Sequence, residues 1–436
     1  MDRGKLVISS SLVLLLLAMF AFGACSGDTA TDEPTKTEAA TEMPTEVEPV
    51  TITIGCMYDL TGPSSGVMTR AQYAVDDYFK YVNETNYLPG VELDWMWGDT
   101  KFELSRTTLH YAKFKESGMD IMLSQAGQDA IAVKPKLEKD KIVAVSWGND
   151  FREMSPPGWA FGTIPTYDGW LPAFCKLISE TWNYEEEGKP RVISVGVDAE
   201  WGRSFEKFTY PFAEDYNVEY GGNLVFPMKS MDFSTYVAQV KKFEPDFVYV
   251  IGAFPHEVGL VKELYKQSVD ATILACITGV WPVPIFIESL SPEAAAMVQV
   301  ITPHPVLGDD SPGTNLAREI LERYHSDDPE FVAFNNRDVS YCLGFSEAYA
   351  LVEGIKQTLA EVGSADKIDG DALYSGFKNV NFDLEGFMPN FQWGEERRWG
   401  LDYVRLYEFE GDKMVPASEW FKCLTPLELL ERVEAE

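Results

Sequence analysis

Two short apolar segments, with a helix-length segment between them, constrain the fold of this chain most. Residues 120–124 read Asp-Ile-Met-Leu-Ser, and residues 142–146 read Ile-Val-Ala-Val-Ser. A polar loop follows each segment, at residues 125–128 and 147–150. Two buried parallel strands joined by a helix form a β-α-β unit, so both loops lie at the carboxyl edge of one sheet. Ligands of open α/β sheets bind at that edge, and we interpret the loops as half of a binding cleft. Two ordinary strand ends would give the same pattern.

Similar segments recur along the chain and predict an α/β fold. Further strands are predicted at residues 51–58, 91–97, 191–197, 247–251, 272–277 and 298–302. Helices are predicted between them by the spacing of apolar residues, as at 102–116 and 170–182. This alternation is typical of doubly wound parallel sheets. A long buried helix is predicted at 339–362 and a terminal hairpin at 403–415, while 161–167 and 303–305 look like crossovers.

The first 24 residues have the features of a secretory signal peptide. Arg3 and Lys5 precede a mostly apolar stretch at 6–22, and small residues precede Cys25. Residues 21–25, Ala-Phe-Gly-Ala-Cys, resemble a bacterial lipobox, with Phe where Leu is usual. We therefore expect Cys25 to be lipidated, and the protein to be a cell-membrane lipoprotein that faces the periplasm or the exterior. An ordinary soluble secreted protein is the alternative.

Residues 25–50 predict a disordered acidic tether. They are rich in Thr, Glu, Pro and Ala and have almost no large apolar side chains, so they cannot bury enough surface to offset chain entropy. The whole chain has a net charge of −33 at pH 7. That charge excludes nucleic acid as a partner and argues against adsorption to anionic lipid. The expected contact with a membrane is through the lipid alone.

Enzyme, metal and cofactor motifs are weak or absent from the sequence. No His or Cys pair has zinc-like spacing, and no phosphate-binding loop motif occurs. Residues 344–348, Gly-Phe-Ser-Glu-Ala, faintly resemble a nucleophile elbow but fall inside the predicted buried helix. Asp198 and Glu200 could act as an acid/base pair, although such pairs are common by chance. We predict no enzyme, metal or cofactor, and we expect the scattered cysteines to be buried without a disulfide framework.

Five segments carry a resemblance to a known family. They are the Leu60-Thr61-Gly62-Pro63 turn after a strand containing Ile54-Gly55, the strand at 142–146, Asp198 with Trp201-Gly202, Met-Asp-Phe-Ser at 231–234, and Pro-Asp-Phe-Val at 245–248. In this order they resemble the periplasmic binding proteins of the branched-chain amino-acid (Leu/Ile/Val-binding) type, which serve ABC importers. The resemblance extends from Thr53 to about Pro416.

The resemblance implies a type I periplasmic binding protein fold, with two doubly wound parallel-sheet lobes joined by three crossovers. It divides the chain into lobe 1 at 51–166, lobe 2 at 167–301, a return to lobe 1 at 302–395, and a return to lobe 2 with a C-terminal tail at 396–436. It also implies that an ABC permease and its ATPase are partners. We expect a monomer that captures an amino acid or a related amide, amine or organic acid.

The resemblance also indicates a candidate site at the strand ends of both lobes. Hydroxyls and amides of the first lobe would hold a ligand carboxylate, while Asp150 or Asp168 could pair with a ligand cation. The second lobe would supply aromatic walls, and residues 277–279 contain no acid for a ligand ammonium group. Trp281 also follows a predicted strand and suits a flat or apolar ligand. The predicted site residues are Ser124, Gln125, Gly127, Ser146, Trp147, Gly148, Asn149, Asp150, Asp168, Trp201, Phe254 and Thr278.

Two other functions remain open from the sequence. The same fold can serve as a sensing module that reports a ligand to a membrane partner. A sensor fused to its output would continue into a transmembrane or signalling segment, and the sequence to Glu436 shows neither, so we favour the importer receptor. An enzyme is the third possibility.

Overall fold

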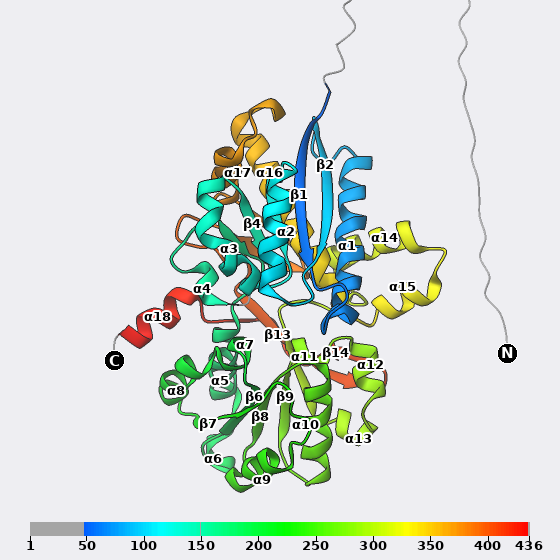
Figure 1. The fold of residues 1–436 in the computed structure, drawn as a ribbon. Coiled ribbons are helices and arrows are strands. Elements are labelled where there is room, and N and C mark those ends of the chain that lie inside the picture. Colours follow the sequence, from blue (N-terminus) through cyan, green and yellow to red (C-terminus); the bar gives the residue numbers. More distant parts are fainter. Residues whose placement is uncertain (1–47, 149, 435–436) are drawn as a thin grey trace, which may run out of the picture. The chain divides into compact units, whose positions relative to one another are not determined.

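The computed structural model of the protein describes residues 48–148 and 150–434 (Figure 1). The predicted signal peptide, Cys25, most of the predicted tether and Asn149 lie outside these residues. Within the described part of the chain, no helix is long and apolar enough to cross a membrane. The five cysteines of this part are free in the structure, and all five are buried, as predicted.

The first lobe is built on a parallel sheet of five strands in the order β2-β1-β3-β4-β5. The strands are β1 (Val50–Tyr58), β2 (Val91–Asp99), β3 (Ile121–Ser124), β4 (Val143–Ser146) and β5 (Ala160–Gly162). Helices α1 (Ser65–Glu84), α2 (Leu104–Glu116) and α3 (Gly127–Asp140) connect the first four. Every residue of β3 and β4 is buried, as a sheet covered by helices on both faces requires. The β-α-β unit predicted at 120–150 is therefore confirmed.

The second lobe repeats this arrangement and adds antiparallel strands. Its sheet has the order β14-β13-β10-β9-β8-β6-β7, and β15 pairs with β13. Strands β6 (Arg191–Val197), β7 (Glu219–Phe226), β8 (Phe247–Ile251), β9 (Thr272–Cys276) and β10 (Val298–Thr302) run parallel. Strands β13 (Tyr403–Glu410), β14 (Lys413–Pro416) and β15 (Phe421–Lys422) form antiparallel pairs. The predicted two-lobed α/β fold is confirmed, although β7 was not predicted.

The remaining elements surround these two sheets. In and around the second lobe they are η1 (Tyr167–Gly169), α5 (Trp170–Thr181), α6 (Tyr184–Glu187), α7 (Glu200–Arg203), α8 (Glu206–Asp215), α9 (Ser234–Phe243), α10 (Phe254–Lys266), α11 (Ile277–Val280), α12 (Val283–Glu288), α13 (Pro292–Ala295) and α18 (Pro426–Glu434). In and around the first lobe they are α4 (Phe151–Met154), α14 (Pro312–His325), α15 (Pro329–Asn335), α16 (Ser340–Val362), η2 (Ala365–Lys367), α17 (Gly370–Phe377) and the hairpin β11 (Asn381–Leu384) with β12 (Met388–Gln392).

Three crossovers join the lobes, after β5, after β10 and before β13. The first and third run side by side, because the Gly162 amide donates to the carbonyl of Arg398 at 2.7 Å. The Trp393 indole N–H also donates to the Gly162 carbonyl, at 2.8 Å. The Arg398 side chain is buried and donates to the carbonyl of Gly158 at 2.6 Å and to the Tyr374 hydroxyl at 3.0 Å. We expected the first crossover to begin at residue 161, but β5 first pairs with β4.

The long helix α16 forms most of its contacts with α1 and was predicted nearly to the residue. Gly344 lies where the two helices meet. A Cβ atom added at Gly344 would lie 2.0 Å from the carbonyl oxygen of Ala71 in α1, so only glycine allows this close approach. The faint elbow motif at 344–348 is therefore part of a buried helix–helix contact, since an elbow requires a strand-to-helix turn.

Candidate ligand-binding site

The two parallel sheets direct equivalent loops to one cavity. In each lobe the first strand lies between the second and the third, in the orders β2-β1-β3 and β7-β6-β8. Loops at the carboxyl ends of the strands diverge at such a switch point and leave a crevice for ligands. A cavity of about 310 Å³ is lined by Ser64 after β1, Gln125 after β3, Trp201 after β6 and Phe254 after β8. It therefore lies at the switch points of both lobes.

The wall of the cavity is mostly apolar and aromatic. Its lining residues are Pro63, Ser64, Val67, Met68, Phe102, Gln125, Ala126, Trp147, Tyr167, Trp201, Met228, Gly252, Ala253, Phe254, Thr278 and Trp281. Among these described residues there is no Asp, Glu, Lys, Arg or His. The cavity is also at the small end of the usual range for small-molecule sites. The lining suits a small solute with an apolar body.

Asp59 fixes the turn that carries Ser64 into the cavity. Its buried carboxylate accepts hydrogen bonds from the Ser64 amide and hydroxyl, both at 2.7 Å. The Gln125 side-chain oxygen accepts the amide of Asp59, and its Nε2 donates to the Ser64 hydroxyl at 3.5 Å. The loops after β1 and β3 are thus tied to each other, and their polar side chains are held in place before a ligand arrives.

A cluster of aromatic rings closes the side of the cavity next to the crossovers. The rings of Trp147, from the first lobe, and Trp281, from the second, are 4.7 Å apart. Tyr167 packs edge-on against Trp147 at 5.8 Å, and His304 stacks on Trp147 at 6.4 Å. Burial lowers the pKa of His304 to about 3, so its ring is neutral at physiological pH. The cluster adds aromatic surface to the site but no charge.

Three long helices begin at the cavity wall. Ser64 immediately precedes α1, Ala126 precedes α3, and Ala253 precedes α10, and all three of these residues line the cavity. The first amides of a helix lack partners within the helix and carry partial positive charge. Helix N-termini are favourable positions for anionic groups, and the N-termini of α1, α3 and α10 lie at this cavity.

The structure brings together five of the predicted site residues, which are Gln125, Trp147, Trp201, Phe254 and Thr278. Ser124, Gly127, Ser146, Gly148, Asp150 and Asp168 do not line the cavity, and Asn149 lies outside the described residues. Binding roles for all of these residues stay predictions. Sequence reasoning missed Val67, Met68, Phe102 and Met228, whose only signal is that they follow strands β1, β2 and β7.

Several of the predicted site residues form hydrogen bonds or close packing contacts with other residues of the protein. The Ser146 hydroxyl donates to the buried Glu153 carboxyl, whose pKa burial raises to about 8. The Ser124 hydroxyl donates to the carbonyl of Ala126 at 3.5 Å. Gly148 has a positive φ of 82°, and a Cβ there would lie 2.4 Å from the Cα of Gly162. These residues support the loop after β4 and the first crossover.

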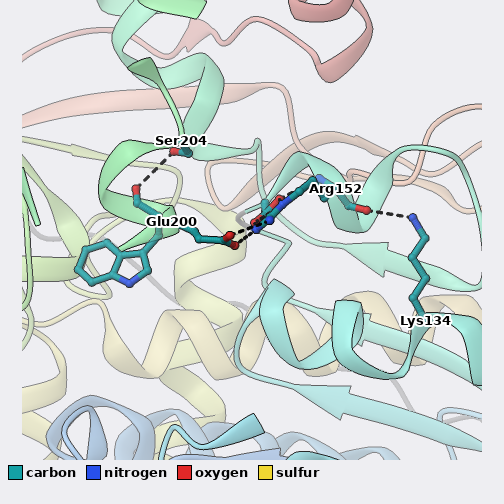
Figure 2. A network of polar contacts seen from close by, with 6 residues as sticks. Lys134, Arg152, Glu200 and Ser204 are labelled. Carbon is teal, nitrogen blue, oxygen red and sulfur yellow. Dashed lines mark hydrogen bonds and ion pairs between the residues drawn. The ribbon is translucent and has the colours of Figure 1, made fainter. Parts of the chain in front are cut away.

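Asp150 pairs with Arg152, which is part of the polar network shown in Figure 2, and Asp168 interacts with both through its charge. The Asp150 carboxylate caps α4 by accepting the Arg152 amide at 2.8 Å, and it also accepts Arg152 Nε at 3.0 Å. Asp168 is buried in η1, and burial, followed by the charge of Asp150, raises its pKa to about 7. The Asp150 carboxylate is therefore engaged by Arg152, and Asp168 is only partly charged at neutral pH.

Comparison with known proteins identifies the family. The chain matches the periplasmic binding protein family over residues 51–413 and belongs to it. This confirms the prediction made from the five sequence segments. The family consists of solute-binding proteins rather than enzymes, as the sequence predicts, and membership implies an extracytoplasmic location. No curated protein sequence matches significantly.

Solved structures with the same fold include several solute-binding proteins. A branched-chain amino-acid ABC transporter protein from Thermus thermophilus with bound valine is 17% identical, with a TM-score of 0.73 over 88% of this chain and 98% of that chain. A fatty acid ABC transporter substrate-binding protein from Thermomonospora curvata is 16% identical, with a TM-score of 0.71 over 86% and 92%. A solute-binding protein from Rhodopseudomonas palustris HaA2 in complex with p-hydroxybenzoic acid is 16% identical, with a TM-score of 0.71 over 87% and 100%. At these identities the likeness is one of fold.

Proposed function

We propose that this protein captures a small organic acid with an aromatic or aliphatic body between its lobes and delivers it to the permease and ATPase of an ABC importer. The observation that carries the proposal is the cavity itself. It combines apolar walls and no charged side chain among its lining residues with the N-termini of α1, α3 and α10. Helix N-termini favour a carboxylate, and the apolar walls favour the rest of the ligand.

An α-amino acid or an amine fits this cavity less well. A buried ammonium group that is not paired with an acid is strongly unfavourable. The predicted acids do not supply this partner, because Asp150 pairs with Arg152 and Asp168 does not line the cavity. The amino-acid and amine alternatives therefore rank below the organic acid.

The solved structures of the same fold are consistent with this choice. The Rhodopseudomonas palustris protein binds p-hydroxybenzoic acid, and the Thermomonospora curvata protein is described as a fatty acid binder. Both ligands join one carboxylate to an apolar body. The Thermus thermophilus protein binds valine, which adds an ammonium group. The fold thus accommodates both organic acids without an ammonium group and amino acids, and the lining of this cavity favours the organic acids.

A thermal-shift screen tests the ligand class. We expect p-hydroxybenzoate and short fatty acids to raise the melting temperature, because a ligand that binds only the folded protein adds about 2.7 kcal/mol of stability at a hundredfold excess over Kd. p-Hydroxybenzamide is the matched control, since it keeps the ring and removes the negative charge. Valine and putrescine test zwitterions and cations. A larger shift with either of these than with every acid would contradict the proposal.

The variant Trp201→Ala tests whether the ligand binds in the cavity. Trp201 is half-buried and lines the wall, so its loss should weaken binding of the best acid by about 2 kcal/mol. Calorimetric titration measures this change. Trp182→Ala is the control, because Trp182 is also half-buried in the second lobe but packs on Phe247 away from the cavity. Equal affinity in the natural protein and Trp201→Ala would show that the ligand binds elsewhere.

We also propose that the protein is anchored to the membrane through lipid on Cys25. The proposal rests on the small residues before Cys25 and on the Thr/Glu/Pro-rich stretch after it. When the protein is expressed in bacteria, we expect it in the membrane fraction with a lipidated N-terminal peptide by mass spectrometry. Cys25→Ala should abolish the lipid and either release the protein or block its maturation. An unmodified Cys25 in a membrane-bound mature chain would refute the anchor.

A further inference from the structure

An arginine outside the cavity joins the two lobes. Arg152, in α4 of the first lobe, donates from Nη1 to Glu200 of α7 in the second lobe at 2.9 Å. A second contact joins Nη2 of Arg152 to the same carboxylate. This fork geometry matches a guanidinium to a carboxylate through two parallel hydrogen bonds. The pair is separated by 48 residues in sequence and is drawn in Figure 2.

Contacts within the first lobe also hold Arg152. Asp150 holds the guanidinium through Nε at 3.0 Å while it caps α4. The Arg152 carbonyl accepts Lys134 Nζ of α3 at 3.0 Å, and Lys134 also donates to the carbonyl of Pro156 at 2.9 Å. The arginine is thus fixed to the first lobe at both its main chain and its side chain, so little conformational entropy is lost when it meets Glu200.

The second-lobe half of the contact is directly connected to the cavity wall. Glu200 is followed in the chain by Trp201, which lines the cavity. The carbonyl of Trp201 accepts the Ser204 hydroxyl at 3.3 Å, which ties the turn to the residues that follow (Figure 2). A contact that restrains Glu200 therefore also restrains the backbone of Trp201 at the cavity wall.

We propose that Arg152 is a positioning residue for ligand capture, which holds Glu200 across the lobes and thereby keeps the lobes closed and Trp201 against the cavity. The inference rests on the proposed capture of a solute between the lobes. The side chains of Arg152 and Glu200 are 45% and 69% exposed, so the pair is weak enough to break when the lobes open. Arg337 and Asp412 also pair between the lobes, at 2.8 Å, but neither adjoins a residue that lines the cavity.

Hydrogen–deuterium exchange of the full chain, without any ligand, tests the proposal. In Glu200→Gln at about 0.01 M salt, we expect peptides that cover residues 64–68 and 252–254 to exchange about two- to fivefold faster than in the natural protein, the range set by an exposed ion pair. Both peptides lie on the cavity wall and are distant from residue 200 in sequence. At about 1 M salt, where charges are screened within about 3 Å, the natural protein should match the variant.

Arg203→Gln is the matched control. Arg203 has the same 45% exposure as Arg152 and pairs with Asp198 at 2.9 Å, but both partners lie in the second lobe. Its exchange should equal that of the natural protein. Unchanged exchange in Glu200→Gln at low salt, or the same increase in Arg203→Gln, overturns the proposal. Because no ligand is added, a failure to bind any tested solute would refute the proposed function and leave this result untouched.

Discussion

Replacing Trp147 with alanine should lower the free energy of unfolding by about 3 to 5 kcal/mol and weaken binding of an organic acid by at least about 2 kcal/mol. Trp147 is only 4% exposed and packs against Trp281, Tyr167 and His304. Its removal would leave a cavity that these rings cannot fill, because they come from the second lobe and from two different crossovers. Its removal would also take away one wall of the ligand cavity.

Urea denaturation and calorimetric titration measure the two effects of Trp147→Ala separately. Trp182→Ala is the control for the chemical change, since Trp182 is half-buried and contacts Phe247 in the second lobe. We expect it to cost less stability and to leave binding unchanged. If Trp147→Ala unfolds at the same urea concentration as the natural protein, packing of Trp147 against Trp281 does not stabilise the fold.

Replacing Gly344 with alanine should lower the free energy of unfolding by about 3 kcal/mol. The new Cβ would lie 2.0 Å from the Ala71 carbonyl oxygen. The obstacle is backbone rather than a flexible side chain, so α1 and α16 would have to move apart. These two helices share the most extensive helix–helix contact of the first lobe, and the start of α1 lines the cavity. We therefore expect weaker ligand binding as a secondary effect.

Gly66→Ala is the control for Gly344→Ala, because Gly66 lies in α1, the helix that packs on α16, but has no atom within 4 Å of its added Cβ. Alanine favours a helix over glycine, so this change should be neutral or slightly stabilising. Thermal denaturation of both variants, followed by circular dichroism, measures the difference. Equal melting temperatures for the two variants would refute the close packing of α1 on α16.

The sequence predicts the fold best where apolar runs are continuous. Strands β3, β4, β8 and β10 are almost wholly buried, so their composition alone identifies them. Strand β7 was missed because it lies at the edge of its sheet, is mostly exposed or half-buried, and contains Gly221 and Gly222. Strand β5 was missed because only three residues pair before the chain crosses to the second lobe.

The candidate site is predictable where it follows recognisable strands. Gln125 and Trp147 come directly after β3 and β4, Phe254 is the third residue after β8, and all three line the cavity. The environment of Asp150 could not be predicted, because it depends on Arg152 being held between Asp150 and a glutamate 48 residues further along the chain. Local sequence shows that Asp150 can cap a helix, but only the packing of two lobes shows that its charge is already paired.

The pairing of the first and third crossovers limits how the lobes can move. Gly162 is bonded to Arg398 and Trp393, and the Arg398 side chain is bonded to Gly158 and Tyr374 of the first lobe. Two connecting segments that are hydrogen-bonded to each other in this way must bend together. We therefore expect the lobes to have one main relative motion, a rotation about the paired first and third crossovers. A ligand that contacts both lobes then closes the protein by stopping only that rotation. Substitutions in the cavity can therefore change which ligand is preferred without changing how the lobes close.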